Sequence, residues 1–127
     1  QQQNEFKQNA EAEAKDVTIS PADEDFLNKA LRFVEKNMDN SEYSVDELSD
    51  DMAMSRATLF RKMRSVIGMS PTDFIRNTRL KRAAQLITEG HLSVTEIAYS
   101  VGYSSPGHFT KSFKKEFGVL PTQYHKT

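Results

Sequence analysis

Two stretches of the chain decide its fold, because each has the pattern of the same pair of helices. The first is SVDELSDDMAMSRATLFRKMRSVIG, residues 44–68, and the second is SVTEIAYSVGYSSPGHFTKSFKKEFG, residues 93–118. At an offset of 49 residues their first halves share a Ser followed three residues later by Glu, the pattern of a capping box. Their second halves align at an offset of 50, so the second turn is one residue longer. A short capped helix, a tight turn and a second Ser-capped helix form the helix-turn-helix pattern.

The second helix of each unit has an apolar stripe on one side and polar donors on the other. Its apolar residues lie four positions apart, at Leu59 and Met63 and again at Phe109 and Phe113. A helix enters the major groove of DNA only if its outward face is free of core residues and offers donors to base edges. We therefore expect DNA contact from the opposite stripes, which carry Arg56, Phe60, Arg61, Arg64, Gly107, Thr110, Lys111 and Lys114.

The residue types in these stripes suit different parts of DNA. Arg61 could donate two hydrogen bonds to a guanine, Lys111 could donate as a point charge, and Thr110 could contact a thymine methyl. Arg64 and Lys114 lie one turn further on, where contact with phosphate is favoured. The alternative is that both stripes are solvated faces of core helices. Two such units in tandem within a basic half of the chain weaken that alternative.

Charge is divided unevenly along the chain. Residues 1–53 carry five Lys or Arg against 14 Asp or Glu, whereas residues 54–127 carry 12 against four. The basic part indicates a polyanionic partner, although a solvated surface can have the same composition. The sequence has no Cys, which excludes disulfides and thiolate chemistry. No apolar run approaches the roughly 20 residues of a membrane span, so we expect no membrane contact by this chain and a cytoplasmic location.

Residues typical of helix starts and helix ends recur along the chain and predict an all-α fold. Ser20 and Ser70 are each followed by Pro, which is typical of a helix start, and a Gly follows several apolar helical stretches. We predict about seven helices, at residues 21–39, 45–52, 56–67, 71–89, 94–101, 106–117 and 121–125. The 71–89 helix would connect the two units within a domain of residues 20–127. The polar residues 1–19 would form a linker or tail.

Several short motifs, spread over about 80 of the 127 residues, are similar to one known family. They are Arg79-Leu80, Ala83, Ile97-Ala98, Val101-Gly102-Tyr103, His108-Phe109, residues 111–115 (KSFKK), Phe117-Gly118 and residues 121–124. With these motifs, residues 44–124 resemble the DNA-binding domain of the AraC/XylS family of bacterial transcription regulators. The resemblance implies two recognition helices in successive major grooves of double-stranded DNA. It also implies base-reading positions at Arg56, Ala57, Phe60, Arg61, Pro106, Gly107, Thr110 and Lys111.

Two details refine this expectation. Pro106 and Gly107 depart from a polar pair often found in the family, which predicts weaker base reading by that helix start. The first helix, with residues 54–63 (MSRATLFRKM), resembles the output domain at the C-terminus of hybrid two-component sensors. Such proteins join a sensor, a histidine kinase, a receiver and a DNA-binding domain in one chain. This resemblance implies control by upstream domains, a homodimer in the full-length protein, and transcription activation through RNA polymerase; the first residue, Gln1, agrees with a longer parent.

Other kinds of site find little support in the sequence. The three His residues lack metal-ligand spacing, and no phosphate loop, Ser elbow or paired catalytic carboxylates occur. We therefore expect no catalytic residues, no metal and no cofactor. The second hypothesis is a helical protein-interaction module whose groove binds a partner helix. We interpret Asp50 and Asp51 as a solvated helix face, and Tyr99 and Tyr103 as packing residues.

Overall fold

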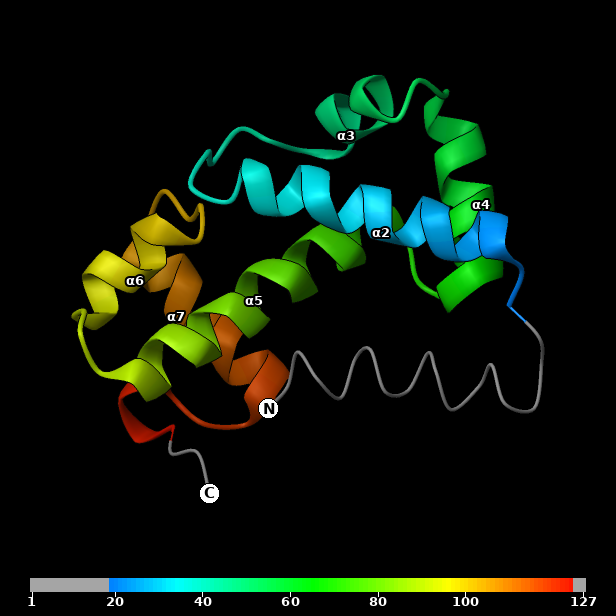
Figure 1. Ribbon diagram of the computed structural model, residues 1–127. Helices are drawn as coiled ribbons and strands as arrows, with labels where there is room; N and C mark the ends of the chain where they lie inside the picture. The colour runs from blue at the N-terminus through cyan, green and yellow to red at the C-terminus, as the bar shows by residue number, and fades with distance from the viewer. Residues whose placement is uncertain (1–18, 125–127) are drawn as a thin grey trace.

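The computed structural model describes residues 19–124, and within them every regular element is helical (Figure 1). The proposed tail, residues 1–19, therefore lies almost entirely outside the described residues. The all-α prediction is confirmed. The elements are α2 (Pro21–Lys36), α3 (Val45–Asp51), α4 (Arg56–Ile67), α5 (Pro71–Glu89), α6 (Val94–Ser100), α7 (Pro106–Phe117) and the 3-10 helix η1 (Pro121–Gln123).

The prediction of a last α-helix at residues 121–125 needs correction. Instead of an α-helix over residues 121–125, the chain forms the three-residue η1, and Tyr124 is already extended at φ −76° and ψ 124°. The ring of Tyr124 packs against Phe113 and Phe117, with centroids 5.5 and 5.4 Å apart. Burying this ring against α7 requires the chain to leave the helical conformation, so aromatic packing outweighs the local helix signal of Pro121.

The helices begin where serine side chains satisfy free backbone donors. Ser20, Ser55, Ser70, Ser93 and Ser105 each accept a hydrogen bond from the amide three residues further on. In the two predicted capping boxes the Glu carboxylate also accepts the cap amide at 2.9 Å. Three helices end at a left-handed glycine, as predicted, at Gly68, Gly90 and Gly118.

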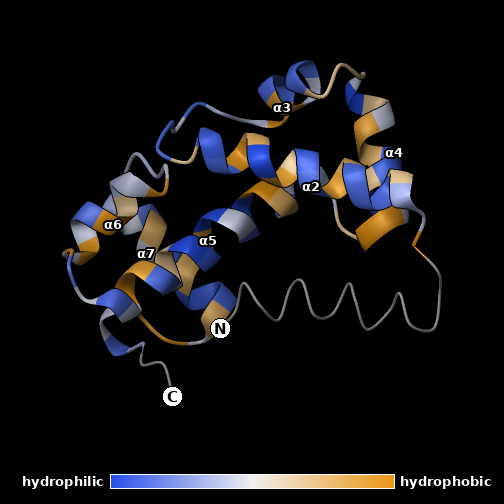
Figure 2. Cartoon of the chain, viewed as in Figure 1, coloured by the Kyte–Doolittle hydropathy of each residue, from blue (hydrophilic) through white to orange (hydrophobic). Residues whose placement is uncertain are grey.

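Two apolar clusters form the core, and α5 contributes to both. The first cluster lies among α2, α3 and α4 and takes Phe74 and Ile75 from the start of α5. The second lies among α6, α7 and the rest of α5, which supplies Leu80, Ala83 and Ala84. Figure 1 shows α5 passing between the two groups of helices, and Figure 2 shows hydrophobic and hydrophilic residues alternating around α2 and α4. One long helix therefore carries both helix-turn-helix units.

Arg79, near the middle of α5, ties the two units together. It is only 6% exposed. Its guanidinium donates to the carbonyls of Met38 (2.8 Å), Asn40 (3.0 Å) and Tyr43 (3.1 Å) between α2 and α3, and to that of Val101 (2.7 Å) at the end of α6. Burial lowers the pKa of this guanidinium, and the four acceptors compensate for the lost water.

The turn of the second unit must have glycine next to Arg79. Gly102 has a φ of +91°, and a Cβ there would overlap the Arg79 guanidinium and lie 2.5 Å from the Met38 carbonyl oxygen. In the first unit the aligned residue is Ala53, whose φ is +58°. The two turns therefore share a left-handed backbone, and Gly102 also makes room for the Arg79 side chain.

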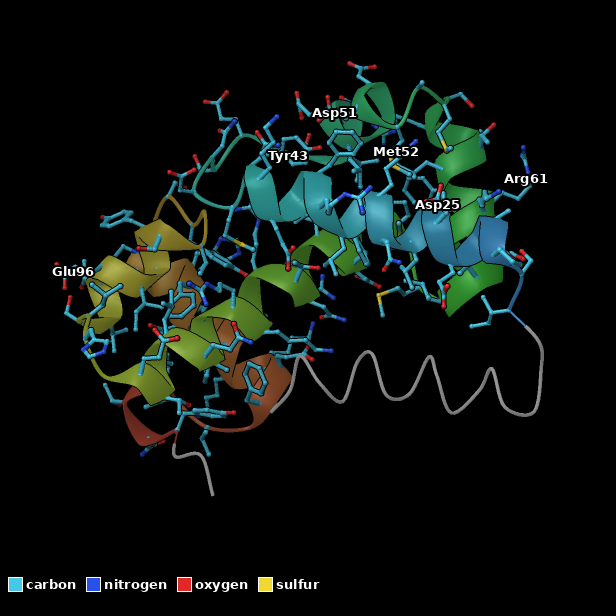
Figure 3. The ribbon with its side chains drawn as sticks, viewed as in Figure 1. Asp25, Tyr43, Asp51, Met52, Arg61 and Glu96 are labelled. Atoms are coloured by element: carbon cyan, nitrogen blue, oxygen red, sulfur yellow. The ribbon has the colours of Figure 1, made fainter. Side chains whose placement is uncertain are left out.

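Two interpretations of single residues need correction. Asp51 accepts a hydrogen bond of 2.7 Å from the hydroxyl of Tyr43, so it is more than a solvated carboxylate (Figure 3). Burial, together with this bond, raises the pKa of Tyr43 well above its usual range. Tyr103 is buried as expected, but Tyr99 is 50% exposed, because α6 buries its opposite side through Ile97 and Ala98.

Candidate nucleic-acid interface

The helix α4 presents the first predicted stripe to solvent. Its apolar side, Leu59 and Met63, is fully buried. The side facing away from the core carries Ala57, Arg61 and Arg64, all exposed. Arg61 extends from α4 away from the rest of the molecule, held only by a 3.4 Å bond from its Nη2 to the Thr58 hydroxyl (Figure 3). This side of α4 therefore presents two exposed guanidinium groups, those of Arg61 and Arg64.

The other two predicted residues of α4 have partners within the protein. Arg56 is exposed and its Nη1 lies 2.9 Å from Asp46 Oδ1. The Arg56 guanidinium carbon also lies 5.9 Å from the centre of the Phe60 ring, which is half-buried against the first core cluster. An exposed ion pair of this kind contributes roughly 0–1 kcal/mol, so a phosphate could replace Asp46 at little cost.

The helix α7 likewise has a buried apolar side and an exposed side. Phe109 and Phe113 are fully buried. Gly107, Lys111 and Lys114 are exposed. Pro106 and Thr110 are half-buried, since each lies toward the buried stripe.

The exposed faces also include residues outside the predicted set. His108 and Lys115 are exposed three residues before and four residues after Lys111, and Ser65 lies four after Arg61. Residues three or four apart share one side of a helix, so this spacing could have identified them. The His108 ring meets Tyr103 edge-on at 5.4 Å, and the His108 side chain stays exposed.

A cavity of about 650 Å³ separates the two units. Residues near the first turns of both recognition helices border it, among them Arg56 and His108. Its lining also includes one side of α5 and the turn of the second unit. The lining residues are Ser41, Tyr43, Ser44, Val45, Asp46, Arg56, Thr72, Ile75, Arg76, Arg79, Gly102, Tyr103, Ser104, His108 and Ser112.

Neither a metal-binding cluster nor a membrane-spanning helix occurs among residues 19–124. Across residues 19–124, no three His, Asp or Glu side chains come close enough to hold a metal ion. None of the helices from α2 to α7 combines the length and apolar character needed to cross a membrane.

Two helix-turn-helix units on one connecting helix, each with an outward basic recognition helix, define a two-unit DNA-binding domain. Residues 48–127 match the family described as a helix-turn-helix domain, which is of the AraC type. The chain belongs to this AraC-type family of DNA-binding domains, found in transcription regulators.

Individual relatives support this membership. Over 109 residues the chain is 42% identical to histidine kinase P4 of Formosa agariphila, a match that covers 86% of the chain and 8% of the kinase. The chain also spans 28–38% of the length of other curated regulators that it matches.

Solved structures agree in fold. The C-terminal domain of AraT, a response regulator from Geobacillus stearothermophilus, is 28% identical with a TM-score of 0.73, covering 84% of this chain and 85% of that one. The DNA-binding domain of AdpA, solved in complex with a target DNA, is 26% identical with a TM-score of 0.70, covering 77% and 87%.

Proposed function

We propose that this chain reads a specific DNA sequence by placing α4 and α7 in successive major grooves on one face of the duplex. The observation that supports this best is that two exposed basic recognition faces are carried on one helix, α5. At about 1.5 Å per residue, its 19 residues extend about 28 Å. Successive major grooves lie about 34 Å apart, a separation that α5 and the radii of the packed helices can span together.

Each predicted residue has a role in this proposal. Arg61 and Lys111 donate to base edges, and Thr110 contacts a thymine methyl from its half-buried position. The small Ala57 and Gly107 let each helix approach the bases closely. Phe60 lies beside the Arg56 guanidinium and Pro106 is the first residue of α7, so both shape the surface next to the base-reading side chains. The residues that bind phosphate are Arg56, Arg64 and Lys114.

The domain boundaries form part of the proposal. Residues 20–127 make one DNA-binding domain, in which residues 44–68 and 93–118 are the two units and residues 71–89 connect them. Residues 1–19 link this domain to whatever precedes it. The two core clusters, one under each unit and both anchored on α5, support this division.

Regulation is proposed from the relatives. Because one of them is a histidine kinase matched over 8% of its length, and another is the C-terminal domain of a response regulator, we propose a hybrid two-component parent. In that parent, a phosphorelay through sensor, kinase and receiver controls this domain, which acts on the cytoplasmic side of the membrane. A homodimer then activates transcription through RNA polymerase.

Salt dependence tests whether DNA binding is the main function. With about 6 phosphate contacts, the logarithm of the binding constant falls against the logarithm of salt concentration with a slope near −5. The measurement is a titration of a duplex DNA at several salt concentrations. A flat dependence would contradict DNA binding and would favour an apolar groove for a partner helix.

A further inference from the structure

The cavity between the two units borders the first turns of both recognition helices. Arg56, at the start of α4, and His108, in the first turn of α7, both line it. Its α5 side carries Thr72, Arg76 and Arg79. If α4 and α7 occupy successive major grooves, the DNA backbone that separates those grooves must cross the surface between the two helices. That surface is this cavity.

The ionic side chains of the cavity favour an anion. Its lining includes three arginines and one aspartate, Asp46. Asp46 pairs with Arg56 at 2.9 Å. The guanidinium of Arg79 donates hydrogen bonds to four backbone carbonyls. These acceptors are uncharged, so they leave the positive charge of Arg79 in place. The lining is therefore net positive.

Arg76 is an arginine of the connecting helix α5 that can reach a ligand in the cavity. It is exposed, and its Nη2 lies 2.8 Å from Oδ1 of Asp73 in an i,i+3 pair whose side chains are 44% and 46% exposed. Exposed pairs are weak, and a guanidinium binds phosphate through two parallel hydrogen bonds. A phosphate can therefore replace Asp73 as the partner of Arg76. Thr72 and Ser104, both exposed, add hydroxyl donors to the same cavity.

We propose that this cavity binds the sugar-phosphate backbone of the DNA between the two major grooves, and that Arg76 donates to a phosphate oxygen there. The inference rests on the proposed function and adds a third contact region to it. Contacts to phosphate position a protein without reading sequence. The bases opposite the cavity are therefore tolerant, although the protein contacts the backbone beside them.

The first test compares Arg76→Ala with Arg82→Ala. Arg82 is exposed on the same helix but does not line the cavity, and its guanidinium donates to the side chain of Gln85. Arg76→Ala is expected to weaken binding equally for a selected duplex and a random one, and to flatten the salt slope by about one unit. Arg82→Ala is expected to keep the affinity and slope of the parent. Equal slopes for Arg76→Ala and the parent would overturn the proposal.

A second pair of variants distinguishes a lost DNA contact from a general loss of folding. Thr72→Glu places a carboxylate in the cavity at the second position of α5, where an acid stabilises the helix N-terminus. Ala22→Glu makes the same charge change at the second position of α2, outside the cavity lining. Thr72→Glu is expected to weaken binding of the duplex while Ala22→Glu does not. Equal effects would overturn the cavity proposal alone, whereas a parent whose binding ignores salt would overturn the proposed function with it.

Discussion

At the scale of single residues, the aligned turn positions Ala53 and Gly102 differ in what surrounds them. Ala53 is exposed and holds a φ of +58°, a conformation that costs an L-residue about 1–2 kcal/mol. Gly102 instead lies under the Arg79 guanidinium, where any side chain would collide. The left-handed turn therefore costs mild backbone strain in the first unit. In the second unit the same turn requires glycine, because a side chain has no room there.

Replacing Ala53 by glycine should stabilise the protein. Relief of the left-handed strain exceeds the entropy that a glycine adds to the unfolded chain, so we expect the free energy of unfolding to rise by about 0.5–1 kcal/mol. Urea unfolding followed by circular dichroism measures it. The matched variant Ala57→Gly, in the helical first turn of α4, should lower the same free energy. A loss of stability in Ala53→Gly would show that the turn is not strained.

Sequence patterns placed some residues of the candidate site on exposed helix faces and missed other contacts. Four-residue spacing identified the buried stripes, and so placed Arg61 and Lys111 on exposed faces. It missed the role of Arg79, whose four acceptors lie 22–41 residues away along the chain. Local patterns cannot reveal such a contact, because it exists only once α5 has docked against both units.

At the scale of elements, α5 sets the geometry between the two units, and Arg79 is its link to their turns. Gly102→Ala would displace this guanidinium and leave buried carbonyls without a donor, at about 1–3 kcal/mol for each group. Gly90→Ala is the control, because Gly90 is also left-handed, at φ +76°, but a Cβ there meets nothing within 4 Å.

We expect Gly102→Ala to lower the free energy of unfolding by at least about 2 kcal/mol more than Gly90→Ala does. Both variants carry similar backbone strain, so the difference isolates the Arg79 contacts. Urea denaturation of the two variants and the parent measures it. Equal losses would mean that Arg79 does not hold the units together.

The helices themselves were predictable because their signals are local. Serine caps, Pro at the first position and terminal glycines fixed most helix ends within a residue or two of the observed bounds. The exceptions have tertiary causes. The segment after Pro121 stops early because Tyr124 packs on α7. The helix predicted to end at residue 39 ends at Lys36, and the chain beyond it turns so that the carbonyls of Met38 and Asn40 accept hydrogen bonds from Arg79.

At the scale of the whole molecule, charge divides between two regions. Residues 19–53 carry ten Asp or Glu against three Lys or Arg, whereas the outward faces of α4 and α7 are basic. An acidic region beside basic recognition helices repels phosphate and favours one orientation on DNA. In the proposed complex, this division of charge orients the domain, and the side chains of α4 and α7 select the sequence.

The isolated chain should be a monomer. Both apolar clusters are covered by its own helices, and among the described residues only Leu92 and Tyr99 are large exposed hydrophobics. That leaves too little apolar surface for a stable dimer interface. Analytical ultracentrifugation at micromolar concentration should give the monomer mass of 14.5 kDa. A stable dimer would contradict the proposal that upstream domains impose dimerisation.

The central claim is that α4 and α7 read two separate DNA elements, and binding-site selection with the parent, Arg61→Ala and Lys111→Ala tests it most directly. We predict two short elements about 10 base pairs apart, with the element read by α7 less stringent because of Pro106 and Gly107. Arg61→Ala should relax one element and Lys111→Ala the other, each costing about 1–3 kcal/mol. Arg64→Ala and Lys114→Ala, as controls, should weaken all sequences evenly. If Arg61→Ala and Lys111→Ala degrade the same base positions, or leave the preferred sequence unchanged, the two-groove account is wrong.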